Sequence, residues 1–183
     1  MVLFNSTNIK KTLAISTCWI VINYTFYGQL TIEALHISGV KVNLREGLYK
    51  YFFTVFGELP SLFLTLFMID HPKYGRKNSL FLFFAGAAIF HLFFAFTAFT
   101  SMGSIARFFM KDVFSILYPL TTESFETMIR TKGFGLCSGI GRLGAILMPF
   151  IVIPLDEWSS ASVYVSFSLF SGVACLTVWN WVE

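Results

Sequence analysis

Six long apolar segments, separated by short polar linkers, set the pattern of the chain. Each covers about 20 residues, the length that an α-helix needs to cross the hydrocarbon of a bilayer. Membrane β-strands are about half as long and alternate in polarity, and that alternation is absent from these segments. The predicted membrane-spanning helices are residues 12–31, 49–69, 79–99, 102–122, 133–153 and 160–181.

Short linkers predict that neighbouring helices run antiparallel and pack into one bundle. Residues 33–48 form the longest predicted connection. Composition agrees with a membrane class, because 56% of the 183 residues are hydrophobic and only 13% are charged, about half the charged share of a soluble domain. Mean hydropathy is +0.71. The sequence therefore predicts an all-α polytopic membrane protein, a bundle of six helices forming one domain over residues 1–183.

The distribution of lysine and arginine predicts the orientation of the helices. Seven of these cations fall on one side of the predicted bundle and two on the other, which places both termini in the cytoplasm. A formal net charge of +3, without a basic stripe, argues against a nucleic-acid partner. The cysteines and histidines lack metal-ligand spacing, so neither a metal nor a cofactor is expected.

Charged residues inside the predicted helices are the main candidates for chemistry, because each is expensive in a bilayer unless it is paired or hydrated. At least one of Arg107, Lys111 and Arg142 is expected to line a substrate path. The alternative is that the side chain snorkels to the membrane surface, which suits Arg107 near a helix end better than Arg142 at mid-depth. The candidates for a substrate cavity are Glu58, Arg107, Lys111, Asp112 and Arg142.

Glu58 precedes Pro60, and that proline is predicted to kink its helix because it clashes with the carbonyl four residues back. A carboxylate at a bend suits a cation or proton site, which would couple transport to protons or ions. The alternative is a structural ion pair of Glu58 with Arg142 or Lys111. Arg107 and Lys111 share one helix face and must meet anions, for which Glu58, a missing partner and an anionic substrate are all candidates.

A second group of charges is expected to form gate contacts at the cytoplasmic ends of the helices. Asp70 opposes the dipole at the end of its helix and needs a counter-charge, for which Arg76 is the nearest candidate. Glu126 and Arg130 are spaced for a second contact. The predicted gate residues are Asp70, Gly75, Arg76, Lys77, Glu123, Glu126 and Arg130.

Small residues in the fifth segment predict close helix packing. Gly135 and Gly139 have GxxxG spacing, and Gly141 forms a second small pair with Ala145. Pro60 and Pro149 are expected to shape the same packing by breaking regular helix geometry.

These motifs resemble the major facilitator superfamily over more than a hundred residues. Asp70 followed by Gly75-Arg76-Lys77 is similar to its loop pattern D-R-x-G-R-R/K, although His71-Pro72 replaces the first arginine. Residues 118–130 resemble Y-x-Y-T-x-E-x-[YF]-P-T-x-x-R, with Glu126 at the proline position. Residues 133–149 resemble G-x-G-x-C-S-x-x-x-R-x-G-x-x-x-x-P. With Glu58-Leu59-Pro60, they are similar to the branch that holds organic cation/anion transporters and synaptic vesicle 2-related proteins.

The resemblance implies that this chain is the C-terminal half of a transporter with twelve spans. Such a transporter moves a small organic, charged solute by rocking one half against the other. The expected partners are therefore the bilayer, the solute, and either an N-terminal six-helix half or a second copy. A fragment is the favoured interpretation, residing in the plasma membrane or an intracellular vesicle. The alternatives are a transport-incompetent regulator or scaffold and, less favoured, a membrane enzyme, for which no catalytic cluster is evident.

Overall fold

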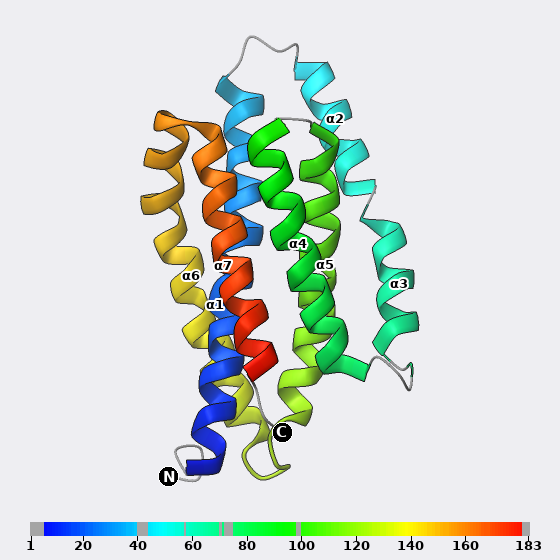
Figure 1. The fold of residues 1–183 in the computed structure, drawn as a ribbon, viewed down its shortest axis with the longest axis vertical. Helices are drawn as coiled ribbons and strands as arrows, with labels where there is room; N and C mark the ends of the chain where they lie inside the picture. The colour runs from blue at the N-terminus through cyan, green and yellow to red at the C-terminus, as the bar shows by residue number, and fades with distance from the viewer. Residues whose placement is uncertain are drawn as a thin grey trace.

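The computed structural model describes residues 6–39, 44–56, 58–69, 71, 75–97 and 100–180, and all the regular structure in these ranges is α-helical. The helices stand side by side in an elongated bundle (Figure 1). Their bounds are α1 Ser6–Gly39, α2 Leu44–Phe56, α3 Leu59–Ile69, α4 Gly75–Thr97, α5 Thr100–Glu123, α6 Arg130–Trp158 and α7 Ser160–Asn180. The predicted all-α membrane bundle is confirmed.

The second predicted span is two helices rather than one. α2 ends at Phe56 and α3 begins at Leu59, so the chain is interrupted next to Pro60, where the sequence predicts a kink. The amide of Glu58 donates to the carbonyl of Val55 at 3.0 Å, which closes a turn between the two helices. α2 and α3 follow one another along the side of the bundle (Figure 1), so together they occupy the length of one span.

α1 differs most from its predicted bounds, because it continues eight residues beyond position 31, to Gly39. This helix is buried around much of its circumference: Ile15, Cys18, Trp19, Val21 and Ile22 are each at most 3% exposed. A helix that is buried on several sides has no polar face to mark its end. Sequence pattern alone therefore places its boundary poorly.

α6 packs against α1 through its small residues. A Cβ built at Gly141 would lie 2.7 Å from the Cβ of Trp19, and one built at Gly144 would collide with the carbonyl oxygen of Ile20. Only glycine permits this approach of two backbones. The sequence predicts close packing at Gly141, which the structure shows, but gives no such signal at Gly144.

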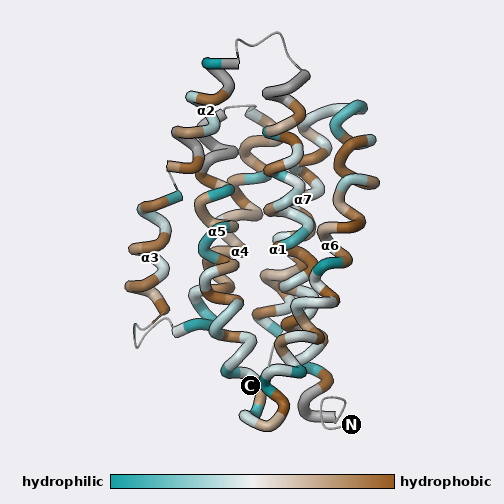
Figure 2. The backbone as a smooth tube through the Cα atoms, turned by 180° about the vertical axis from the view of Figure 1, so that it is seen from behind, coloured by the Kyte–Doolittle hydropathy of each residue, from teal (hydrophilic) through white to brown (hydrophobic). Residues whose placement is uncertain are grey.

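Three described helices are long and apolar enough to cross a membrane by composition alone: α4, α6 and α7. α5 is long enough but is interrupted by charge, and Figure 2 shows hydrophilic positions within its length. α1 begins and α7 ends at the same end of the bundle (Figure 1). The charged residues of α5 therefore need partners inside the bundle if this helix is to cross a membrane.

Candidate functional site

A buried ionic cluster joins α1, α5 and the start of α3. Arg107 on α5 is only 3% exposed and Glu58 is 9% exposed. The Arg107 guanidinium donates from Nε to a carboxylate oxygen of Glu58, and from Nη1 to a carboxylate oxygen of Glu33 at 2.5 Å. The predicted alternatives, a Glu58 pair with Arg142 or with Lys111, are not formed, because Arg107 occupies this carboxylate.

Aromatic rings complete the surroundings of Arg107. Its guanidinium carbon lies 5.8 Å from the ring centre of Phe26 on α1 and 5.5 Å from that of Tyr51 on α2. Ring faces attract cations, and the attraction strengthens when water is excluded. The arginine is thus held by two carboxylates and two rings from three other elements, an arrangement that ties α2, α3 and α5 to α1.

Glu33 is a member of this cluster that sequence reasoning missed. The sequence places it in the connection over residues 33–48, because the apolar pattern predicts that the first helix ends at Thr31. In the structure, Glu33 stands on the last turns of α1, one turn after the buried Gln29. The four-residue spacing of Gln29 and Glu33 is the signal that could have extended the helix.

Asp112 lies deeper on α5 and is completely buried. Its carboxylate faces the hydroxyl groups of Ser61 and Thr65 on α3, with the charges of Lys111 and Glu58 acting on it. Lys111 is partly exposed and forms no ion pair with another described residue. Asp112 and Arg107 therefore point into the bundle from α5, whereas Lys111 lies at its margin.

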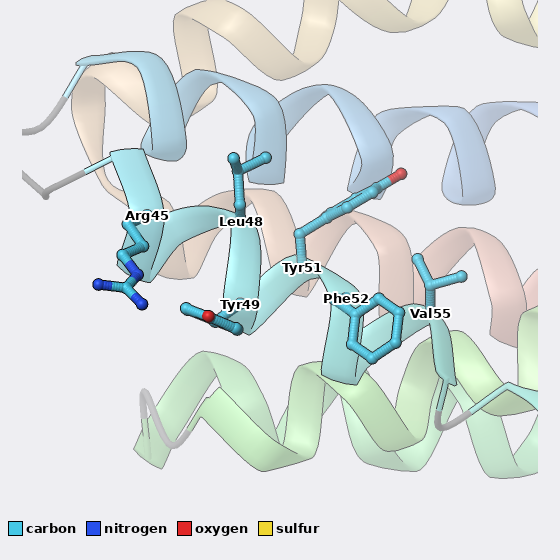
Figure 3. A pocket seen from close by; sticks show the side chains of 6 residues that line it. All are labelled: Arg45, Leu48, Tyr49, Tyr51, Phe52 and Val55. Atoms are coloured by element: carbon cyan, nitrogen blue, oxygen red, sulfur yellow. The ribbon is translucent and has the colours of Figure 1, made fainter.

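A hollow of about 640 Å³ lies along α2 and is lined by Arg45, Leu48, Tyr49, Tyr51, Phe52 and Val55. Figure 3 shows that all six side chains project from this single helix. Arg45 lies over the ring of Tyr49 at 5.8 Å, and the rings of Tyr49 and Phe52 are more than half exposed. Tyr51 links the hollow to Arg107. This apolar and aromatic wall was not predicted as part of a site.

Arg142 is placed very differently from Arg107. It is exposed on α6 and forms no ion pair with any other described residue. The buried side of α6 consists of Gly133, Cys137, Gly141, Gly144, Met148 and Val152, and Arg142 lies away from it. Gly135 and Gly139 share the face of Arg142, and a Cβ at either would meet no atom within 4 Å. The close packing predicted for the Gly135–Gly139 pair is therefore not made within the described residues.

The end of the bundle where α1 begins carries the predicted gate residues. Arg76 at the start of α4 pairs with Glu123 at the end of α5, a contact that connects two predicted members. Gly75 has a φ of 62°, the left-handed conformation that favours glycine. Lys77 is partly exposed, while Glu126 and Arg130 are exposed. Asp70 lies outside the described residues, so its contact with Arg76 stays a prediction.

The two predicted packing prolines have different effects on their helices. Pro60 is the second residue of α3, where its missing amide proton is not needed. Pro149 lies inside α6, which continues past it and past Pro154 to Trp158. Pro60 thus marks the start of a helix, whereas Pro149 does not end one.

Known proteins with similar sequences are numerous. The protein svop-1 of Caenorhabditis elegans is 28% identical over 176 residues, covering 84% of this chain. The synaptic vesicle 2-related protein of Xenopus laevis is 34% identical over 134 residues, covering 67% of this chain. The solute carrier family 22 member 15-like protein of Xenopus laevis is 29% identical over 172 residues, covering 90% of it. No family model matches the chain.

The chain spans only part of each of these relatives. The matched regions cover 34%, 22% and 34% of their respective lengths. The similarity nevertheless extends over most of this chain, and therefore over several helices of the bundle rather than over one motif.

Proposed function

Because the chain belongs to the major facilitator superfamily, like its synaptic vesicle 2-related and solute carrier relatives, we propose that it forms one half of a membrane transporter. The transporter carries a small organic, charged solute by alternating access, with the solute held between this half and an N-terminal six-helix half. Both termini face the cytoplasm, in the plasma membrane or an intracellular vesicle.

The observation that supports this proposal most is the position of Arg142. A charged residue in a membrane helix is costly when it faces lipid, and such residues face a bundle interior or a water-filled cavity. Arg142 lies on a face of α6 that has no partner among the described residues, beside two uncovered glycines. A cavity between two halves accounts for both features, and the guanidinium would contact an anionic group of the solute.

The Arg76–Glu123 pair supports a gate at the cytoplasmic end. It joins α4 to α5 with side chains that are 29% and 54% exposed. Contacts of this kind are weak enough to break and form during a cycle. In the proposed transporter, this pair biases which side of the membrane the cavity opens to.

Thiol accessibility tests the cavity without knowledge of the solute. Arg142→Cys and Leu147→Cys place single thiols about 140° apart on α6, at similar depth. Both native residues are exposed in the structure. In the complete transporter, a membrane-impermeant, charged thiol reagent is expected to label Cys at 142 and not at 147, because water reaches only the cavity face. The unsubstituted chain measures the background of Cys18, Cys137 and Cys175.

Transport itself is tested with a panel of labelled organic anions and cations. Arg142→Ala is expected to abolish uptake of the accepted solute, while Arg142→Lys retains part of it through its charge. Equal labelling at positions 142 and 147, together with unchanged uptake in Arg142→Ala, would contradict the proposed cavity. Labelling at 142 without uptake of any solute would favour the transport-incompetent alternative.

A further inference from the structure

We propose that Asp112 is a proton-binding residue, with Ser61 and Thr65 as the hydroxyl groups that share its proton. The inference rests on the proposed function, because in a transporter this proton is the coupling ion. From the sequence, Glu58 was the expected coupling carboxylate. The structure gives Glu58 a fixed cationic partner in Arg107, whereas Asp112 forms no ion pair with another described residue.

Asp112 is a titratable carboxylate that is buried as completely as an apolar core residue. It is 0% exposed, and the Thr65 and Ser61 hydroxyls face its carboxylate, but neither oxygen makes a well-formed hydrogen bond to another described residue. Thr65 is 2% exposed, and its hydroxyl faces Asp112 without a well-formed hydrogen bond to any other described residue. Enclosing an ionised carboxylate without a cationic partner is costly, which favours a neutral acid or a bound cation at this position.

Ser61 shows that the group around Asp112 lacks a hydrogen-bond donor. The hydroxyl of Ser61 already donates its single proton to the carbonyl oxygen of Glu58 at 2.7 Å. Towards Asp112 it can therefore present only lone pairs. Two carboxylate oxygens and the Ser61 oxygen all accept, and the Thr65 hydroxyl can supply at most one donor. A proton on Asp112 converts one acceptor into the donor that this group lacks.

The charges around Asp112 leave room for one positive charge. The charged groups that act on it are Lys111, next to it on α5, and Glu58, at the head of α3. Glu58 shares Arg107 with Glu33. Three carboxylates thus face two cations, and one added proton makes the group neutral. A proton needs no additional volume at a side chain that is already fully enclosed.

The location of Asp112 between α3 and α5 could link its protonation to helix movement. Ser61 and Thr65 lie on α3, immediately after the break at Glu58, and Asp112 lies on α5. Protonated Asp112 holds α3 against α5 through hydrogen bonds to the hydroxyls. Ionised Asp112 repels the lone pairs of Ser61 and requires α3 to move away or water to enter. Proton binding and release would therefore be linked to the position of α3.

Infrared spectroscopy of the chain in lipid tests the proposal without a solute. A protonated carboxylic acid has a C=O stretch apart from those of carboxylates and amides, and burial separates it from exposed acids. The unsubstituted chain is expected to show this band at neutral pH, and Asp112→Asn to lose it. Glu157→Gln, which removes an exposed carboxylate, is the matched control and should retain it. A band that survives in Asp112→Asn would overturn the proposal.

Thermal unfolding provides a second measurement in case the band is weak. If folded Asp112 keeps a proton that the unfolded chain has already released above about pH 4, stability falls as the pH rises beyond that point towards neutral. Asp112→Asn mimics the neutral acid and is expected to remain folded and to lose this pH dependence, whereas Glu157→Gln keeps it. A midpoint that rises with sodium concentration in the unsubstituted chain, and not in Asp112→Asn, would overturn the proton in favour of a metal cation.

The two experiments separate this inference from the transport proposal. Loss of the infrared band in Asp112→Asn supports proton binding even if no solute is transported. Uptake that depends on Arg142 but is the same at every pH would sustain the transporter and reject proton coupling.

Discussion

Two arginines in membrane helices, Arg107 on α5 and Arg142 on α6, meet opposite environments. Arg107 is 3% exposed and is enclosed by two carboxylates and two aromatic rings of the same chain. Arg142 is exposed and pairs with no described residue. In the sequence both are charged residues within an apolar segment, so both are expected to carry the same free-energy cost in a bilayer. The difference teaches that Arg107 joins helices within this bundle, whereas Arg142 has no counter-charge among the described residues.

The largest effect is expected from Arg107→Ala. It leaves Glu33 and Glu58 facing each other without a cation, and breaking a buried ion pair on one side costs about 3–5 kcal/mol. Thermal unfolding in detergent, followed by tryptophan fluorescence, measures the loss. The matched variant Arg142→Ala should change stability by no more than about 0.5 kcal/mol, as expected for an exposed position without partners.

A triple variant sharpens this comparison. Arg107→Met with Glu33→Gln and Glu58→Gln removes all three charges and should recover much of the lost stability, because no buried charge is left unpaired. Equal stability of Arg107→Ala and Arg142→Ala would show that the two arginines do not differ as described.

A smaller effect is expected from the glycines on the two sides of α6. Gly144→Ala drives a methyl group into the backbone of Ile20 and should cost about 1–3 kcal/mol through overpacking. Gly139→Ala meets open space and should gain up to about 1 kcal/mol in helix propensity. The detergent concentration at which each variant unfolds measures the stability difference between Gly144→Ala and Gly139→Ala. If Gly139→Ala leaves this chain stable but destabilises the complete transporter, the uncovered face of α6 packs against the other half.

The smallest effect is expected at the exposed pair. Glu123→Gln removes the partner of Arg76 and should lower stability by about 1 kcal/mol or less, since exposed ion pairs contribute little. The effect should shrink as salt is added, because exposed charges are screened. Urea-assisted unfolding at low and high salt measures it. A salt-insensitive loss of several kcal/mol would show that this pair is buried in the lipid-embedded protein, as Arg107 is.

Much of the fold follows from the sequence because membrane helices have a strong signal of length. The six segments correspond to the observed bundle, and the kink expected at Pro60 is an interruption between Phe56 and Leu59. The extension of α1 to Gly39 was not predictable from polarity, because polar residues such as Glu33 are accommodated by a partner on another helix. Local patterns carry no information about such a partner.

The site was predicted by residue type and not by pairing. Glu58, Arg107 and Asp112 were all expected to carry function, and the structure brings them together around α3 and α5. Spacing along one helix shows which residues share a face but not which helix lies opposite. For that reason, the sequence places Glu33 in a connection and makes Arg142 a candidate partner of Glu58. Its spacing likewise points to Gly135 and Gly139 rather than to Gly144.

The ionic cluster also has a consequence for biosynthesis. α5 carries Arg107, Lys111 and Asp112 and is not among the helices apolar enough to enter a bilayer on composition alone. The ribosome completes Glu33 and Glu58 before it reaches Arg107, so both carboxylates are already in place when α5 emerges. α5 is then expected to enter the membrane as the counter-ion of helices made earlier. The order of synthesis thereby becomes part of how this chain acquires its topology.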